Sequence, residues 1–298
     1  MLKALFVSLT MMTACETSEK PVAPEGDTMP ANAKSETPAS ANFSASRDGT
    51  RIAFEKVGNG PALVIVGGAL SDRSGGKPLA SKLMDRFTVY TYDRRGRGES
   101  SDTKPYAVER EIEDLGALIE QAGTKAYVYG VSSGAALALQ SAAKLGPTKV
   151  PKLALYEAPY GQEQRDFDEQ KDRVNQLVKT GKPGDAAAFF LSAIGTPPQV
   201  LEDMKRSPDW ERVKRIDFTL AYDYAVLGNG TVPESVERIS IPTLVLDGEK
   251  SIDFIHSAAD HIAERLPNAQ RKTITGQTHQ AAPESVAPLL IEFFGEGR

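Results

Sequence analysis

The stretch AYVYGVSSGAALAL, at residues 126–139, decides the fold of this chain. An apolar run typical of a buried strand ends at GVSSG, and a small-residue pattern typical of a helix follows at once. The flanking glycines allow the sharp turn that exposes the hydroxyl of Ser132 at a helix N-terminus. We therefore predict Ser132 as a nucleophile and the backbone N–H of Ser133 as a donor to an oxyanion. A turn made only for packing would also use glycines, so other features must decide.

Short apolar runs recur along the chain and alternate with stretches of helical periodicity. The runs predicted as strands are residues 62–68, 87–93, 126–131, 152–158, 243–248 and 271–276. Their near-continuous apolarity indicates strands that are buried on both faces of a parallel sheet. Helical spacing is clearest at residues 107–123 and 254–266, and a hairpin is expected to turn at Asp48 and Gly49. This alternation predicts an α/β fold with a mostly parallel sheet flanked by helices.

Two segments depart from the alternation of strands and helices. Residues 15–45 are rich in Pro, Ala, Ser, Thr and Glu, which predicts a flexible tether. Residues 160–237 carry helical patterns with aromatic residues but no convincing buried strand. An insertion of this length between two sheet strands predicts a helical cap over the strand ends. The remaining core comprises residues 46–159 and 238–298.

The N-terminal residues have the pattern of an export signal. Residues 1–14 combine Lys3 with an apolar run and small residues before Cys15, so we predict a signal peptide. MTAC, at residues 12–15, resembles a bacterial lipobox, in which the cysteine becomes the acylated first residue of a mature lipoprotein. An ordinary secretory signal with an incidental cysteine is the alternative. Either pattern predicts an exported, cell-envelope protein, held to the membrane if Cys15 is lipidated.

Charge, cysteine and histidine content exclude several classes of protein. The chain has 35 basic and 40 acidic residues without a long basic stripe, so it lacks the charge pattern of a nucleic-acid-binding protein. A small-molecule partner is the better expectation, and a single cysteine rules out an internal disulfide framework. His256 and His261 point to different faces of a predicted helix, so we expect no metal centre there. No cofactor is implied.

A second glycine pair follows the predicted strand at residues 62–68, in the segment VIVGGAL. A serine nucleophile needs two N–H donors for the oxyanion that its attack creates, and the second donor comes from a loop of this kind. We assign it to the backbone N–H of Ala69. Losing one donor costs about 3 kcal/mol of transition-state stabilisation, so this loop is predicted to matter for catalysis.

The chain resembles the α/β-hydrolase superfamily over residues 46–298. The motifs that carry the resemblance are GGAL at 67–70, YDRRGRGES at 92–100, GVSSG at 130–134 and GQTH at 276–279. The resemblance implies a helical cap inserted after the strand that follows the nucleophile helix, and it implies His279 as the general base. In YDRRGRGES we expect Asp93 to pair with Arg94, Arg95 or Arg97 in a solvated, structural turn.

The carboxylate that would orient His279 is ambiguous. In the family an Asp most often follows the strand at residues 243–248, but Ser251 occupies that position here. Asp253 and Asp247 are nearby substitutes. A second family solution, found in some haloalkane dehalogenases, places a Glu after the strand that follows the nucleophile helix, and Glu157 lies there. We prefer Glu157 and keep Asp253 as the alternative, while a salt bridge from Glu157 to an arginine would give it a structural role instead.

These features predict a serine hydrolase that cleaves esters or related acyl substrates through an acyl-enzyme. Ser132 argues against the dehalogenase reaction, which uses Asp at that position. A cofactor-free haloperoxidase or perhydrolase could use the same triad, although no feature of the sequence favours it. A ligand-binding protein on a hydrolase scaffold is the alternative from a different class, and the sequence does not indicate the substrate or the oligomeric state.

Overall fold

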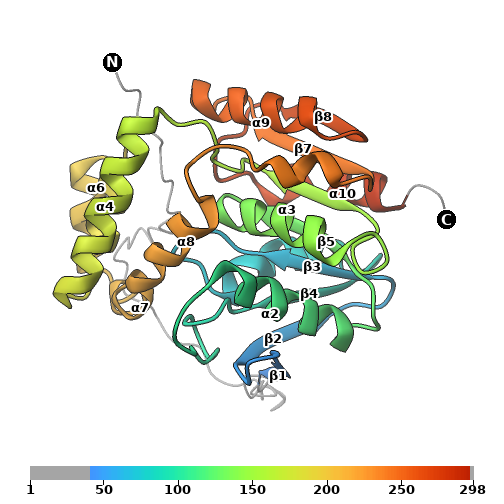
Figure 1. Ribbon diagram of the computed structural model, residues 1–298, viewed down its shortest axis with the longest axis horizontal. Helices are drawn as coiled ribbons and strands as arrows, with labels where there is room; N and C mark the ends of the chain where they lie inside the picture. The colour runs from blue at the N-terminus through green and yellow to red at the C-terminus, as the bar shows by residue number, and fades with distance from the viewer. Residues whose placement is uncertain (1–40, 296–298) are drawn as a thin grey trace, which may run out of the picture.

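The computed structural model describes residues 41–295, which form one mixed sheet with helices on both faces (Figure 1). The predicted signal peptide, Cys15 and most of the predicted tether lie outside the described residues. The first strand covers Asn42–Ala45, four residues that the predicted tether included. These residues pair with the next strand, so the sheet begins before the expected boundary at residue 45.

The eight strands lie in the order β1-β2-β4-β3-β5-β6-β7-β8. β1 and β2 form the hairpin predicted at Asp48 and Gly49, β2 pairs antiparallel with β4, and the strands from β4 to β8 are parallel. The bounds are β1 Asn42–Ala45, β2 Arg51–Val57, β3 Ala62–Val66, β4 Thr88–Tyr92, β5 Tyr127–Val131, β6 Leu153–Tyr156, β7 Thr243–Gly248 and β8 Ala269–Ile274. The predicted α/β fold with a mostly parallel sheet is confirmed.

Helices cover both faces of the sheet because its central strands are apolar on both sides. One buried cluster joins the sheet to α2, α3 and α9, and another joins the opposite face to α1 and α10. The core helices are α1 Lys77–Leu83, α2 Val108–Gln121, α3 Ser133–Leu145, α9 Asp253–Arg265 and α10 Pro283–Gly295, with 3-10 turns η1 Arg73–Gly76 and η3 Glu234–Arg238.

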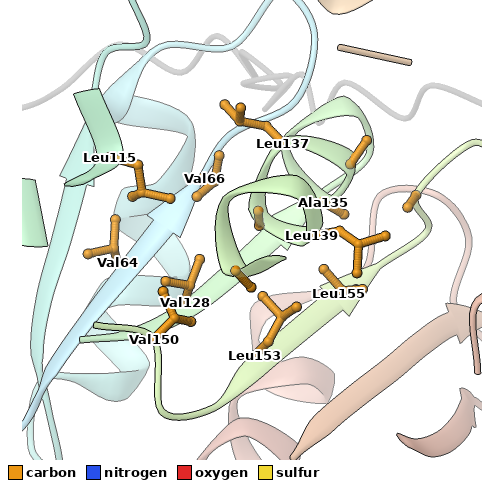
Figure 2. Close-up of a cluster of buried hydrophobic side chains, with 14 of the residues drawn as sticks. Val64, Val66, Leu115, Val128, Ala135, Leu137, Leu139, Val150, Leu153 and Leu155 are labelled. Carbon is orange, nitrogen blue, oxygen red and sulfur yellow. The ribbon is translucent and has the colours of Figure 1, made fainter. Parts of the chain in front are cut away.

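Helix α3 lies on the centre of the sheet and carries the nucleophile motif at its N-terminus. Figure 2 shows its side chains packed against valines and leucines of β3, β5 and β6. Leu137, Leu139, Val66 and Val128 are fully buried in this cluster. Tight packing of this kind holds the helix in a fixed position, so the residue at its N-terminus is fixed as well.

Between β6 and β7, where the cap was predicted, five helices and a 3-10 turn precede η3. They are α4 Gln164–Thr180, α5 Asp185–Ala193, α6 Pro198–Arg206, α7 Trp210–Ile216, η2 Asp217–Thr219 and α8 Leu220–Leu227. Figure 1 shows α4, α6 and α7 grouped to one side of the sheet. They enclose their own apolar cluster, against which Ala69 and Leu70 of the core also pack. No helix between residues 41 and 295 is both long and apolar enough to cross a membrane.

The turn after β4 differs from the expectation of a solvated charged loop. Arg94, Arg95 and Arg97 are 2%, 0% and 1% exposed, and Asp93 pairs with Arg73 instead of with any of them. The expectation is wrong because each arginine finds a carboxylate from elsewhere in the chain. These carboxylates are Glu111, Asp114 and Asp223.

Candidate active site

Four of the predicted site residues follow the carboxyl ends of parallel strands. Ala69 comes after β3, Ser132 after β5, Glu157 after β6 and His279 after β8. The carboxyl ends of parallel strands meet at one edge of the sheet, where ligands bind in open α/β folds. Residue 131 of β5 is paired with Tyr156 of β6, so Ser132 and Glu157 leave the sheet at the same level.

Ser132 occupies a strained turn between β5 and α3. Its φ of 55° and ψ of −128° are unusual for a residue with a side chain, and its N–H donates to the carbonyl of Tyr156 at 2.9 Å. The two motif glycines allow this turn to sit close to its neighbours. A Cβ at Gly134 would lie 2.3 Å from the carbonyl oxygen of Val66, and one at Gly130 would lie 2.6 Å from the Cα atom of Ala135. Larger residues would force the turn apart.

The loop after β3 passes directly beside Ser132. A Cβ built on Gly68 would lie 3.0 Å from the Cβ of Ser132, so a side chain at position 68 would crowd the Ser132 turn. Within residues 41–295, neither the N–H of Ala69 nor that of Ser133 has a hydrogen-bond partner. Both residues line the same cavity as Ser132. Two amides without a hydrogen-bond partner among the described residues therefore belong to residues that share a cavity with Ser132.

Glu157 is the carboxylate that contacts His279. Its Oε2 atom lies 2.6 Å from Nδ1 of His279, and its Oε1 atom accepts hydrogen bonds from the N–H of Gly248 at 2.7 Å and from the hydroxyl of Ser251. Burial alone would raise the pKa of Glu157, but the bonds from His279, Ser251 and Gly248 outweigh it and lower that pKa below 4.5. An ionised carboxylate accepts only, so Nδ1 of His279 carries the proton and Nε2 is left as a base.

The other two acidic residues do not meet His279. Asp253 is exposed at the start of α9, and no hydrogen bond or ion pair joins it to His279 among the described residues. Asp247 is buried at the end of β7, where it pairs with His256 and accepts two hydrogen bonds of 2.7 Å from Arg271. No arginine or lysine of residues 41–295 pairs with Glu157, so the salt bridge considered as its structural role is absent there.

Backbone strain concentrates at the same edge of the sheet. Of residues 41–295, four that are not glycine have positive φ, and three of them are Leu70, Ser132 and Glu157. Such conformations cost about 1–3 kcal/mol each and persist where surrounding structure holds them. The fold therefore maintains unfavourable backbone geometry in the loop after β3, at the Ser132 turn and at Glu157.

A cavity of about 340 Å³ opens between this edge and the inserted helices. Ala69, Ser132, Ser133 and His279 line its floor. Its apolar side chains come mostly from α4, α5, α8 and α9: Phe167, Phe190, Ile194, Tyr224, Leu227, Ile252, Phe254 and Ile255. No lysine or arginine lines this cavity in the described part of the chain. The space fits a small, mainly apolar molecule.

Sequence reasoning missed several side chains that support the site. Ser251 was noted only as the position that lacks an Asp, although its hydroxyl contacts Glu157. Arg97 and Asp223 were not considered for the site, although both contact residues around Ser132. The signal for Ser251 was its position in the loop after β7, whereas Asp223 lies on an inserted helix and has no sequence signal. No group of three or more metal-ligating side chains occurs within residues 41–295.

Comparison with known proteins identifies the family. The family model described as Alpha/beta hydrolase family matches residues 63–289. An alpha/beta hydrolase from Sphaerobacter thermophilus is similar in structure, with 46% identity, a TM-score of 0.78 and coverage of 85% of this chain and 100% of that chain. A thermophilic esterase from Thermogutta terrifontis shares the fold at 23% identity, with a TM-score of 0.70 and coverage of 87% and 99%. "Uncharacterized hydrolase YraK" of Bacillus subtilis is 36% identical over 95 residues, which are 30% of this chain and 35% of that protein. The chain belongs to the alpha/beta hydrolase family.

Proposed function

We propose that this protein is a serine hydrolase that cleaves carboxylic esters through an acyl-enzyme. One observation carries the proposal. Nδ1 of His279 contacts the buried, ionised carboxylate of Glu157, and His279 lines the same cavity as Ser132, whose backbone is strained. A nucleophile, a base and an acid that orients the base define this class of site by their geometry.

The first half of the reaction forms the acyl-enzyme. The Oγ atom of Ser132 attacks the ester carbonyl while Nε2 of His279 takes the hydroxyl proton. The negative charge of Glu157, 2.6 Å from Nδ1, stabilises the imidazolium that results. The carbonyl oxygen becomes an oxyanion that the N–H groups of Ala69 and Ser133 bind. His279 then returns its proton to the departing alcohol as the C–O bond breaks.

The second half releases the acid. Water enters the cavity, gives a proton to Nε2 of His279 and attacks the acyl carbon. The same two amides hold the second oxyanion. Collapse of this intermediate breaks the bond to Ser132, whose oxygen recovers the proton from His279. The enzyme returns to its starting state, with one carboxylic acid and one alcohol as the products.

The lining of the cavity favours neutral esters with an apolar acyl group. Its walls are mainly aromatic and aliphatic, and the lining includes the exposed carboxylates of Glu163 and Asp166, beside and on α4. Asp166 pairs at 3.9 Å with Arg165, an exposed side chain outside the lining. An anionic substrate would meet these carboxylates with no lysine or arginine in the lining to balance them. We expect p-nitrophenyl esters of short and medium acids to be turned over faster than esters that carry a second, free carboxylate.

Labelling with a fluorophosphonate tests the proposed chemistry. The wild-type protein should be labelled and should hydrolyse p-nitrophenyl esters, and Ser132→Ala should abolish both. Ser81→Ala, which removes an exposed hydroxyl on α1, is the matched control and should leave both unchanged. A wild-type protein that is neither labelled nor active would contradict the proposal and would favour a ligand-binding role for the same cavity.

We also propose that the protein is exported and lipidated on Cys15. The proposal rests on the basic and apolar pattern of residues 1–14 and on MTAC at residues 12–15. Expression of the full chain in a bacterial host with a labelled fatty acid tests it. Label in the wild type but not in Cys15→Ala is the expected result. Cleaved, unlabelled protein would indicate an ordinary secretory signal.

A further inference from the structure

A buried cluster of four charges lies behind the predicted oxyanion loop. Arg94 donates two hydrogen bonds to Glu111, at 2.7 and 2.8 Å, and a third to Asp223 at 2.6 Å. Arg97 donates to both carboxylate oxygens of Asp223 at 2.9 and 2.8 Å. These four side chains are 1–4% exposed, and two positive charges balance two negative ones. Asp223 belongs to α8, so the inserted helices supply one of the two carboxylates.

This cluster binds the loop that carries the first predicted donor. Nη1 of Arg97 donates to the carbonyl oxygen of Gly68 at 2.6 Å and to that of Ser71 at 3.3 Å. The Gly68 carbonyl and the N–H of Ala69 belong to one planar, trans peptide, so they point in opposite directions. Arg97 therefore fixes the direction of the Ala69 N–H by holding the other side of the same peptide.

The cluster also binds the residue that carries the second predicted donor. The hydroxyl of Ser133 donates to Oδ1 of Asp223 at 2.7 Å, and Nη1 of Arg94 lies 3.4 Å from the same hydroxyl. Ser133 is the first residue of α3, directly after the nucleophile. Asp223 therefore connects Ser133 on one side to Arg97, and through it to the Ala69 peptide, on the other.

We propose that Arg97 and Asp223 are positioning residues for the oxyanion hole, so that the inserted helix α8 completes the catalytic apparatus besides covering the cavity. The inference rests on the proposed ester hydrolysis, because an oxyanion hole has a role only if an oxyanion forms. Removing Asp223 or Arg97 leaves the amides present but lets their directions vary. The loss is then expected in kcat, since the oxyanion exists only in the reaction and not in bound substrate.

Arg95 provides a matched control for a role in stability alone. It is 0% exposed and donates two hydrogen bonds of 2.7 Å to Asp114 and one of 3.1 Å to Asp48. It comes from the same turn as Arg97 but donates no hydrogen bond to the described residues of the loop after β3. Breaking either buried ion pair destabilises the fold. The two arginine variants should therefore both lose stability, and only the Arg97 variant should also lose kcat.

Kinetics of Arg97→Met and Arg95→Met test the proposal. With a p-nitrophenyl ester, Arg97→Met should lower kcat by roughly 10²-fold and leave KM within about threefold, because one oxyanion donor is misplaced. A trifluoromethyl ketone should lose affinity by a similar factor, since its adduct with Ser132 carries an oxyanion at the same position. Arg95→Met should keep kcat within about threefold despite a lower melting temperature. Equal changes of kcat in both variants would overturn the proposal.

Milder variants and a structural readout keep the test decisive. If the Met variants do not fold, Arg97→Lys and Arg95→Lys take their place. Lysine lacks the planar guanidinium that binds Asp223 and the Gly68 carbonyl at the same time. Only Arg97→Lys should therefore lower kcat, by roughly tenfold. Crystal structures give a readout without turnover: the peptide between Gly68 and Ala69 should rotate in the Arg97 variant and not in the Arg95 variant. An unmoved peptide contradicts the proposal, whereas a wild-type protein without esterase activity contradicts the proposed function instead.

Discussion

Two histidine–carboxylate pairs lie at the ends of neighbouring strands, and only one of them has its histidine in the lining of the cavity that contains Ser132. Glu157 follows β6 and contacts Nδ1 of His279, while Asp247 ends β7 and contacts Nδ1 of His256. Both carboxylate side chains are 0% exposed. The two pairs are therefore alike in chemistry and burial, and their difference lies in their surroundings.

The surroundings differ first in charge. Burial would raise the pKa of both carboxyls, but hydrogen bonds lower both values. The largest lowering effect on the pKa of Asp247 comes from Arg271, whereas for Glu157 it comes from His279. Arg271 neutralises Asp247, so that carboxylate already has a permanent cation as its partner. Glu157 has neutral donors apart from His279, so its charge remains for the imidazolium. A histidine beside a buried carboxylate is thus not sufficient evidence of catalysis.

The surroundings differ also in what the free ring nitrogen can reach. His279 lines the cavity that contains Ser132, whereas His256 is absent from the described lining of that cavity. His256 lies on α9 and is tied to the end of β7 by Asp247. On this comparison we propose a catalytic role for the pair that shares the cavity with Ser132 and a role in stability for the pair beside Arg271.

Replacing the two histidines should produce the largest difference. His279→Ala is expected to lower kcat for a p-nitrophenyl ester by about 10⁵- to 10⁶-fold, because Ser132 loses its base. His256→Ala should keep kcat within about threefold, because its ring serves only the end of β7. Steady-state kinetics of the two purified variants check this. A comparable loss in His256→Ala would remove the distinction between the pairs.

Ser251 tests whether the neutral donors around Glu157 matter. Ser251→Ala removes a hydroxyl that donates to Oε1 of this carboxylate, and a hydrogen bond to a charged group contributes about 1.5–3 kcal/mol. We expect kcat to fall by about tenfold, since the carboxylate is held less firmly. Ser257→Ala, whose hydroxyl donates to a carbonyl within α9, is the control and should not change kcat. An unchanged kcat in Ser251→Ala would show that Gly248 and His279 hold Glu157 alone.

The lowered pKa of Glu157 predicts a small pH dependence of stability. The unfolded carboxyl titrates near 4.5 and the folded one below it, so ionised Glu157 stabilises the fold above pH 4.5. That contribution is lost as the pH falls through the lower, folded-state pKa. Urea unfolding of the wild type and of Glu157→Gln, from about pH 5.5 to about pH 3, should show the wild type losing stability relative to the variant. A constant difference would contradict the lowered pKa.

Much of the fold follows from local patterns in the sequence. The strand and helix runs correspond to β3 to β8, α2 and α9 within a few residues, because burial on both sheet faces leaves a continuous apolar pattern. The turn at Ser132 could be predicted because Gly130 and Gly134 stand where a Cβ would come within 2.6 and 2.3 Å of neighbouring backbone atoms. These features depend on neighbours in sequence or on the backbone alone.

The charged residues could not be placed in the same way. Arg97 and Asp223 are 126 residues apart, and a run of arginines after a strand gives no sign that one of its partners lies on an inserted helix. The choice among Glu157, Asp247 and Asp253 depended on which carboxylate lies within reach of His279. Spacing along the chain does not determine this, because β7 lies between the strands that precede Glu157 and His279. Long-range pairing of this kind is visible only once the sheet order is known.

Turnover by three carboxylate variants tests the central claim most directly. Glu157→Gln, Asp247→Asn and Asp253→Asn each remove one charge from the ends of β6 and β7 or the start of α9. We predict that kcat for a p-nitrophenyl ester falls by about 10³- to 10⁴-fold in Glu157→Gln alone, because His279 loses its orienting charge. Asp247→Asn should lose stability but retain turnover, and Asp253→Asn should change neither. A loss of that size in either aspartate variant, or an active Glu157→Gln, would contradict the assignment of Glu157.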